Sequence, residues 1–400
     1  MNSRGNGVDV IVIGAGPAGL AAAHELARVG RRVLILEQGG SVASSWRAHR
    51  PGLRLHTVRR LSGLPGRAIP RAYGRHVASS DLVRYLEQYA KDLDVRFDSL
   101  VTAVQQVGDT PAHTRWTVTT AGGTMYNAAS IVMATGYNRL PHIPDLPGLA
   151  DFTGSTLHVS EYVGAGQFAG LDVLVVGSGN AAAEAATELV ATGAGRVTMA
   201  VRTTPHIVRR RVGGLSMQAI SIAMNVLPVR LADRLASALA RLTVPDLSAQ
   251  KLPRPLPDLY TRVRRDRSVP VHDTGIVRLL QTGAVTPVAA VVRFEPDTVV
   301  LADGRQLRPD VVMFATGYRR GLDHLLGDRG LLDEHGDPRQ ASGQQAAPGL
   351  SFVGFTVSAT GALRQMAGDA RRLANRHRPV RHLFTARTRS FAGDELRPAR

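Results

Sequence analysis

The sequence predicts an α/β fold in which one domain is inserted into another. Three observations support this prediction: two glycine-rich turns that each follow an apolar strand and open a helix, two later strands that both end in Ala-Thr-Gly-Tyr, and a composition ordinary for a folded α/β protein. The 400 residues, 44% apolar and 5% aromatic, are enough for two or three domains. We therefore expect two Rossmann-like dinucleotide-binding domains with small β-hairpin additions.

The first glycine turn is Gly14-x-Gly16-x-x-Gly19, which follows the apolar run that starts at Val8. Glycines are needed here for the tight turn, for close approach to a pyrophosphate and for helix packing, and the helix N-terminus stabilises the anion. Glu37 ends the next strand, where a carboxylate can bind both ribose hydroxyls and repels a 2′-phosphate. The pattern favours FAD, although a solvated strand end is an alternative interpretation of the acid.

The second turn is Gly177-Ser178-Gly179-x-x-Ala182, and it also lies between a strand and a helix. The strand after that helix is followed by Arg202 instead of an acid. A guanidinium can pair with a 2′-phosphate through two hydrogen bonds, so this turn predicts an NADPH site. Chance is the alternative, since 47 of the 49 basic residues are arginine.

The repeated strand endings define the insertion. One strand ends in Ala134-Thr135-Gly136-Tyr137 and the other in Ala315-Thr316-Gly317-Tyr318, so each closes one βαβ unit. We expect an FAD-binding domain at 1–137 and 318–400, a connecting segment at 138–170 and an NADPH-binding domain at 171–317. Residues 350–355 should supply the last strand of the first domain, and a helix should start near Ala362. The hairpin additions are expected around Gly122-Gly123 and at Asp303-Gly304.

Composition excludes several classes of protein. The chain has no cysteine, which excludes disulfide scaffolds, thiolate metal sites and redox-active cysteine pairs, and no close-set group of metal ligands is recognisable. The net charge of +17 comes from arginines spread along the chain, with a dense tail at 371–400, and we do not expect nucleic-acid binding. The apolar runs at 8–23 and 215–229 contain turn or polar residues, so we expect a cytoplasmic protein without an integral membrane segment.

A further motif stands between the two domains: Phe152-x-Gly154-x-x-x-His158-x-x-x-Tyr162. It resembles the fingerprint of the class B flavoprotein monooxygenases, and Tyr162 favours the flavin-containing monooxygenase type over Baeyer-Villiger enzymes, which have Trp there. The chain is most similar to YUCCA-like enzymes and their bacterial relatives. Four stretches carry that similarity: Leu53–His56, Leu231–Leu235, Val271–Gly275 and Val353–Thr356.

The resemblance implies a monooxygenase in which NADPH reduces FAD, oxygen forms a flavin C4a-peroxide, and one oxygen atom passes to a small organic substrate. It also implies that Trp46 and Val101 contact FAD, and that His56 and Asn180 are polar groups near the reacting rings, with helix capping an equal alternative for Asn180. His158 is expected to act structurally at the domain junction. Two departures from the family pattern are Ser44-Ser45 before Trp46 and Ala182 in the second turn.

Several alternatives remain open from the sequence. The reaction could be hydroxylation of a heteroatom or decarboxylative oxygenation of a 2-oxo acid. Baeyer-Villiger oxygenation of a ketone is the alternative enzyme class. A catalytically degenerate flavoprotein that only binds its ligands is the alternative that is not an enzyme. Residues 206–265 are expected to cover the substrate site. The amphipathic segment 229–244 should pack on its own domain, although a membrane or partner helix is an alternative. The oligomeric state is undetermined.

Overall fold

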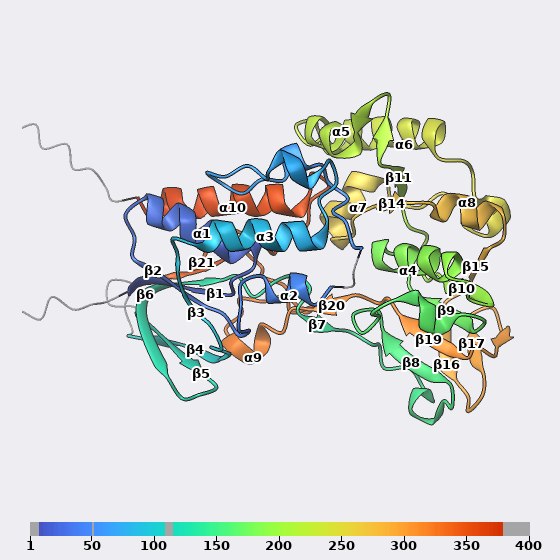
Figure 1. The fold of residues 1–400 in the computed structure, drawn as a ribbon, viewed down its shortest axis with the longest axis horizontal. Helices are drawn as coiled ribbons and strands as arrows, with labels where there is room; N and C mark the ends of the chain where they lie inside the picture. The colour runs from blue at the N-terminus through green and yellow to red at the C-terminus, as the bar shows by residue number, and fades with distance from the viewer. Residues whose placement is uncertain (1–7, 50–51, 109–114, 379–400) are drawn as a thin grey trace, which may run out of the picture.

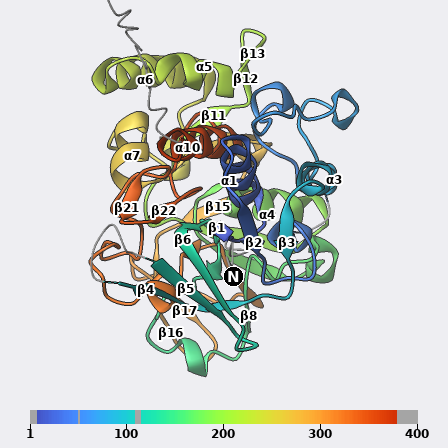
Figure 2. The ribbon, with the colours of Figure 1, turned by 90° about the vertical axis from the view of Figure 1, so that its left-hand side faces the viewer.

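A computed structural model describes residues 8–49, 52–108 and 115–378. The arginine-rich tail beyond residue 378 lies outside these residues. Figure 1 shows two sheet-containing units side by side, with β1 and α10 both in the first unit, and Figure 2 shows the same molecule from the side of the first unit. The two glycine turns, the two sheets and the two hairpin additions have the arrangement that the sequence predicted.

The first sheet has eight strands. Its main path runs β21 (Gln345–Ala347), β22 (Leu350–Phe352), β6 (Met125–Met133), β1 (Val8–Ile13), β2 (Val33–Leu36) and β3 (Asp94–Arg96). β1 pairs in parallel with both β2 and β6, and β22 pairs in parallel with β6. β4 (Val101–Val107) and β5 (Arg115–Thr120) extend the sheet as antiparallel strands, with β5 paired to β6. The late strand β22 therefore completes a sheet begun at the N-terminus.

Three helices cover one face of this sheet: α1 (Pro17–Arg28), α3 (Ser79–Ala90) and α10 (Ala362–Arg376) (Figure 1). α1 and α10 bury apolar side chains against each other, including Leu20 and Leu373. α2 (Ser44–Arg47) lies in the loop after β2, and α9 (Asp323–Leu326) packs near β4 on the opposite face. Because α10 starts at Ala362, the C-terminal segment places a second helix beside the helix of the first glycine turn.

The second sheet has five parallel strands in the order β15 (Val285–Val288), β10 (Arg196–Ala200), β9 (Asp172–Val176), β19 (Val311–Phe314) and β8 (Ser155–His158). α4 (Asn180–Ala191) and α8 (Ile276–Gln281) pack on it. A small sheet of β16 (Val291–Phe294), β17 (Val299–Leu301) and β18 (Gln306–Leu307) contains the expected hairpin. Part of the segment expected to be a connection, Ser155–His158, thus forms an edge strand of this sheet.

The two connections between the units lie together. β7 (Leu140–Pro141) leaves the first unit and pairs antiparallel with β20 (Tyr318–Arg319), which returns to it. Beside this pair, the buried Arg320 forms an ion pair with Asp337 at 2.7 Å, and its guanidinium lies 3.3 Å from the centre of the Tyr137 ring. Arg267 of the inserted unit pairs with the same Asp337 at 2.5 Å. Buried ion pairs of this kind fix geometry, because breaking one leaves an uncompensated charge.

Residues 206–270 form a cap of short elements on the upper side of the inserted unit (Figures 1 and 2). The cap contains β11 (Ile207–Arg209), which pairs with β14 (Val271–Asp273), the hairpin β12 (Arg211–Val212) and β13 (Leu215–Ser216), and the helices α5 (Met217–Met224), α6 (Val229–Thr243) and α7 (Leu259–Asp266). α6 was expected to bury its apolar stripe on its own domain. That expectation is wrong for Leu231, Leu235 and Leu242, which are exposed, because the helix packs through a different face.

No helix among the described residues is long and apolar enough to cross a membrane.

Candidate functional site

The first glycine turn brings the backbone close to the neighbouring strand. Gly14 has φ +107°, and a Cβ on it would lie 2.6 Å from the carbonyl oxygen of Ala134. A Cβ on Gly19 would lie 1.9 Å from the carbonyl oxygen of Gly14. A Cβ on Gly16, by contrast, would meet nothing within 4 Å. The turn is therefore packed tightly against protein on one side and open on the other, as the binding of a pyrophosphate at the start of α1 requires.

Glu37 is buried at the end of β2, next to this turn. One carboxylate oxygen accepts a hydrogen bond from the backbone N–H of Ala15 at 2.7 Å, and the other accepts bonds from Gly39 N–H at 3.0 Å and Ser44 Oγ at 3.2 Å. These bonds compensate for the burial of a charge and hold the carboxylate in one orientation. The oxygen that accepts only the Ala15 bond has a second lone pair, which could accept a bond from a ribose hydroxyl.

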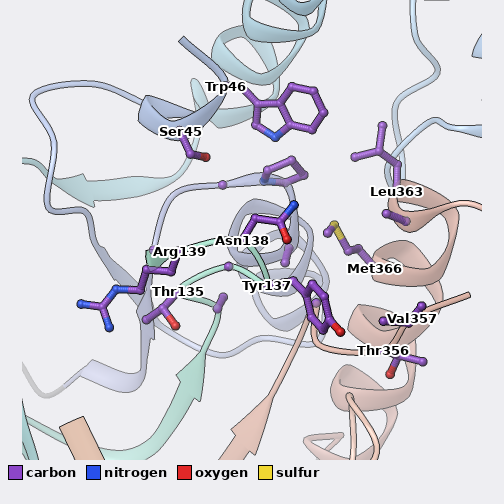
Figure 3. A pocket seen from close by; sticks show the side chains of 18 of the residues that line it. Ser45, Trp46, Thr135, Tyr137, Asn138, Arg139, Thr356, Val357, Leu363 and Met366 are labelled. Carbon is purple, nitrogen blue, oxygen red and sulfur yellow. The ribbon is translucent and has the colours of Figure 1, made fainter. Parts of the chain in front are cut away.

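A cavity of about 520 Å³ extends from the first turn to the junction of the two units. This volume lies in the range of small-molecule and cofactor sites, about 300–1,000 Å³. Figure 3 shows Trp46 on one side of it, Leu363 and Met366 of α10 on another, and Tyr137 and Asn138 between them. The sequence-predicted residues that line the cavity are Gly14, Gly16, Glu37, Trp46, His56, Val101, Thr135, Gly136 and Asn180. The cavity thus brings together nine of the expected site residues from both units.

Two observations show that these residues fit FAD. The hydroxyl oxygen of Thr135 is buried at the cavity and has no hydrogen-bond partner among the described residues, so it is available to a ligand. A Cβ on Gly136, the next residue, would meet nothing within 4 Å. At the end of β6, the backbone of Gly136 is therefore accessible and the hydroxyl of Thr135 has no protein partner among the described residues. Both could contact a dinucleotide that extends from Glu37 past the first glycine turn. The acid, the open turn and the hydroxyl are compatible with the ribose and pyrophosphate of a dinucleotide such as FAD.

The second glycine turn repeats the backbone geometry with different surroundings. Gly177 has φ +133°, and a Cβ on it would lie 2.5 Å from the carbonyl oxygen of Ala315. A Cβ on Gly179 would meet nothing within 4 Å. Ser178 Oγ donates to the carbonyl oxygen of Thr203 at 3.1 Å, and Arg202 is exposed just beyond β10. A second nucleotide could bind here with its 2′-phosphate at the surface, which fits NADPH.

The second strand ending, Thr316 and Gly317, lies where the inserted unit returns to the first. Thr316 Oγ1 donates to the carbonyl oxygen of His142, and the backbone N–H of His142 donates to the carbonyl oxygen of Gly317 at 3.0 Å. Gly317 has φ +86°, and a Cβ there would meet nothing within 4 Å. These bonds tie the strand ending to the outgoing connection and leave the backbone of Gly317 open.

The fingerprint residues serve packing and connection. The Phe152 ring packs edge-on against Phe294 with centroids 5.2 Å apart, and a Cβ on Gly154 would lie 2.5 Å from that ring, so only glycine fits. Tyr162 is buried and donates to Glu188 of α4 at 3.1 Å. The first and last members of the motif therefore anchor β8 to the inserted unit.

His158, the central member, is fully buried at the end of β8, next to the returning connection. Its Nδ1 accepts the backbone N–H of Ser160 at 3.1 Å, which leaves the proton on Nε2, and Nε2–H donates to the carbonyl oxygen of Gly317 at 3.1 Å. Burial lowers the pKa of His158, so the ring is neutral at neutral pH. A neutral histidine that bonds two backbone groups positions the crossover beside it and needs no proton transfer.

His56 reaches the junction from the first unit. Its Nε2 lies 3.2 Å from Glu184 Oε1 of α4, and its Nδ1 lies 3.3 Å from an Arg210 nitrogen. Its ring stacks on His272 with centroids 4.9 Å apart and planes 3° from parallel. Because Arg210 can only donate, Nδ1 accepts and Nε2 carries the proton. The expected site histidine is therefore held by three residues of the inserted unit.

Asn180 is the first residue of α4, but its side chain does not cap that helix. Its Nδ2 donates to the carbonyl oxygen of Pro270 at 3.0 Å, and its Oδ1 accepts the backbone N–H of His272 at 2.9 Å. Gly179 occupies the capping position. Asn180 thus fixes the strand that carries His272 at the wall of the cavity.

Sequence reasoning missed His272 and Gln218, which also line the cavity. Burial, with the Arg210 guanidinium and His76 nearby, lowers the pKa of His272 to about 4, and its buried Nδ1 has no partner among the described residues. Gln218 accepts from Val58 N–H at 2.8 Å and donates to the carbonyl oxygen of Thr360 at 2.9 Å. The available signal for Gln218 was a polar residue inside the apolar run at 215–229, and His272 lay in one of the YUCCA-like stretches.

Comparison with known proteins places this geometry in a family. A family model described as pyridine nucleotide-disulphide oxidoreductase matches residues 11–216. Indole-3-pyruvate monooxygenase YUCCA1 of Oryza sativa subsp. japonica is 35% identical to this chain over 354 residues, which cover 86% of each protein. Probable indole-3-pyruvate monooxygenase YUCCA3 of Arabidopsis thaliana is 32% identical over 358 residues, which cover 86% of this chain and 82% of the relative.

Solved structures show the same fold at lower identity. A flavin-containing monooxygenase from Stenotrophomonas maltophilia is 24% identical with a TM-score of 0.70, covering 93% of this chain and 98% of its own. Bacillithiol disulfide reductase from Staphylococcus aureus is 18% identical with a TM-score of 0.65, covering 92% of this chain and 98% of its own. This chain has no cysteine and therefore cannot form a redox-active cysteine pair. The sequence identities over most of both chains show that the protein belongs to the pyridine nucleotide-disulphide oxidoreductase family and, within it, to the YUCCA-type flavin monooxygenases.

Proposed function

We propose that this flavin monooxygenase uses NADPH and FAD to oxygenate an aromatic 2-oxo acid with loss of its carboxylate as CO₂. The observation that carries the proposal is the single cavity in which the FAD turn, Trp46 and His56 of the first unit meet Asn180 and His272 of the inserted unit. The curated relatives are named for indole-3-pyruvate, an acid of this class.

FAD reduced by NADPH supplies the two electrons that reduce one atom of O₂ to water while the other atom enters the substrate. The reaction balances as 2-oxo acid, O₂, NADPH and a proton giving the shorter carboxylate, CO₂, water and NADP⁺. The task of the chain is to hold both nucleotides, orient the substrate and exclude bulk water.

Electrostatics of the cavity favour an anionic ligand. Glu37 is the one acid among the described residues that line it, and backbone N–H groups already compensate its charge. Arg139 and Arg267 line the same cavity, with Arg267 in an ion pair with Asp337, and Arg210 lies against His56, which also contacts Glu184. Cations thus outnumber acids along the cavity wall, which favours a ligand that carries a pyrophosphate or a carboxylate.

Individual residues then have distinct proposed roles. Glu37 binds the adenosine ribose of FAD, and Thr135 donates to or accepts from the same cofactor. Trp46 forms an apolar wall that excludes water. His272, neutral above pH 4, presents a ring that adds no charge next to the reacting groups, and Asn180 holds it in place. Arg202 pairs with the 2′-phosphate of NADPH.

The test uses the purified, FAD-loaded protein with NADPH and ¹⁸O₂. Indole-3-pyruvate and phenylpyruvate are compared with tryptamine, an indole that lacks the carboxylate. We expect the two acids to stimulate NADPH oxidation and to give CO₂ and a shortened acid that contains one ¹⁸O atom. Oxygenation of tryptamine at nitrogen instead would assign heteroatom hydroxylation, and an ester or lactone from a simple ketone would assign Baeyer-Villiger chemistry; either result without acid turnover contradicts the proposal.

A further inference from the structure

Helix α6 presents an apolar stripe to solvent. Leu231, Leu235, Ala238 and Leu242 are all exposed, with Leu242 at 84%. Their 4-3-4 spacing puts them on one side of the helix, within less than a quarter of its circumference. Val226, 83% exposed, lies in the turn just before the helix. Single exposed leucines are ordinary, but a continuous stripe along about three turns marks an interaction surface.

The stripe is not needed to hold α6 on the protein. The adjacent face holds the helix in place: Ala232 is buried, and Leu239 packs into the apolar cluster around Leu259 and Tyr260 of α7. A cavity of about 140 Å³ lies beneath this inner face. Figures 1 and 2 both show α5 and α6 as the outermost layer of the inserted unit, so the stripe faces away from the molecule.

Charges beside the stripe are mainly basic, and the exposed acid that contacts α6 is Asp258, which accepts a hydrogen bond from Ser237 Oγ at 2.8 Å. Arg230, Arg234 and Arg241 are exposed and lie together along one edge of it. The one acid within α6, Asp233, is buried and accepts hydrogen bonds from Tyr260 N–H at 2.6 Å and Thr261 Oγ1 at 2.6 Å at the start of α7. Its charge is therefore directed into the protein, and the exposed surface of the helix is apolar and cationic.

A second copy of this chain is a poor occupant for this surface. Two α6 helices could pair through the stripe, since the 4-3-4 spacing matches a helix-pair seam. In an antiparallel pair related by a two-fold axis, however, Arg234 of one copy would face Arg241 of the other, and like charges across such a seam are destabilising. An acidic surface has no such conflict.

We propose that the outer face of α6 docks on an anionic lipid surface, with the leucine stripe among the acyl chains at the headgroup boundary and the arginines on the lipid phosphates. An amphipathic helix with leucine on one face and arginine beside it lies in the plane of such an interface. Each basic residue near an anionic surface adds a modest, salt-screened attraction, so attachment is reversible and depends on salt. This docking is independent of the substrate proposed above.

Flotation of the FAD-loaded protein with vesicles tests the docking. Vesicles of phosphatidylcholine alone are compared with vesicles that also contain phosphatidylglycerol, at low and at high salt. We expect the protein to float with the phosphatidylglycerol vesicles at low salt, and the bound fraction to fall at high salt. The double variant Leu235→Ser with Leu242→Ser and the double variant Arg234→Gln with Arg241→Gln should each weaken vesicle binding about tenfold or more.

Matched controls change the same residue types elsewhere on the surface. Val292→Ser on β16 and Arg308→Gln remove an exposed apolar side chain and an exposed charge outside α6 and should float as the unchanged protein does. The flavin absorbance of each variant shows that it is folded and loaded. Vesicle binding that survives both α6 variants overturns the proposal. So does a molar mass in solution of two chains that returns to one chain in the leucine variant, without vesicle binding, since this assigns the stripe to a dimer.

Discussion

The two glycine turns have nearly the same backbone and differ in what surrounds them. In both, the first glycine has a positive φ and lies so close to a strand carbonyl that a Cβ would approach within 2.6 Å or 2.5 Å. At the third small position they diverge: a Cβ on Gly19 would collide with the turn itself, whereas Ala182 carries a Cβ in the buried start of α4. The first turn is therefore folded more tightly against its helix than the second.

The residues predicted to contact the ribose of each nucleotide, Glu37 and Arg202, also differ in how tightly the protein holds them. Glu37 is buried and held by hydrogen bonds to Ala15, Gly39 and Ser44, whereas Arg202 is exposed beyond the end of its strand. A buried acid with a fixed orientation is typical of a site for a permanently bound cofactor. An exposed arginine is typical of a site where a nucleotide binds and dissociates in each catalytic cycle. The comparison teaches that changes at the first turn should affect folding and FAD, and changes at the second should affect the use of NADPH.

The largest effect is expected at Gly14. Gly14→Ala forces a Cβ against the carbonyl oxygen of Ala134 at a φ that side chains rarely adopt, so we expect a poorly folded, colourless protein. Gly16→Ala is the matched control, because its Cβ meets no protein atom and the protein should fold. Flavin absorbance and thermal unfolding measure both. A yellow, stable Gly14→Ala protein would falsify the close packing of the first turn.

The equivalent change in the second turn should separate the two cofactors. Gly177→Ala meets the carbonyl oxygen of Ala315, so the turn must shift and NADPH should lose its binding surface, while FAD stays bound. We expect a yellow protein whose flavin is bleached by dithionite but is reduced by NADPH at least about a hundredfold more slowly. Anaerobic reduction followed at the flavin absorbance gives this rate. Loss of FAD from this variant would show that the assignment of the two turns is reversed.

A smaller effect is expected at Arg202. Removing one charge-assisted contact to the 2′-phosphate costs about 1–3 kcal/mol, so Arg202→Ala should lower the preference for NADPH over NADH by roughly 10- to 100-fold. Steady-state kcat/KM for the two nucleotides gives the ratio. Arg196→Ala, an exposed arginine on the same strand, is the control and should leave the ratio unchanged. If Arg202→Ala also leaves it unchanged, the arginine is not the phosphate ligand.

The smallest effect is expected where the two regions are joined. His158→Ala removes the bond from Nε2–H to the carbonyl oxygen of Gly317 without touching either turn, so both nucleotides should still bind. The two cofactor rings should then be slightly misplaced, and water should enter the cavity. Reduced oxygen should leave as hydrogen peroxide, which raises the ratio of peroxide to consumed NADPH severalfold. His158→Gln can donate the same bond and should recover part of the coupling. Normal coupling in His158→Ala would limit His158 to a packing role.

The sequence predicted the elements whose chemistry is local. Each glycine turn is recognisable because strand, turn and helix follow one another along the chain, and Glu37 and Arg202 stand at the positions after the next strand that a ribose can reach. The connecting fingerprint was recognisable for the same reason, since a side chain such as Phe152 excludes a Cβ at Gly154 two residues away. Such constraints act over a few residues and leave a fixed spacing.

Packing of α6 was not predictable in the same way. The sequence of α6 is clearly amphipathic, but its apolar residues cover a wide sector of the helix. The sequence does not determine which side of that sector the rest of the protein covers. The structure places Ala232 and Leu239 inward and leaves Leu231, Leu235 and Leu242 outside. Which face of a helix is buried depends on neighbours that are distant in sequence, here α7 and β11.

By itself, then, the sequence determined the two nucleotide turns, their acid and arginine, and the family fingerprint, because those features depend on backbone geometry within one βαβ unit. The tertiary structure alone decided the composition of the cavity between the units. It brought His56 onto His272, used Asn180 to hold the strand of His272, and joined Gln218 to both Val58 and Thr360. The contact of Asn180 joins residues about 90 positions apart within the inserted unit. The contacts of His56 and Gln218 join residues 142 or more positions apart, which come together only when the two units pack against each other.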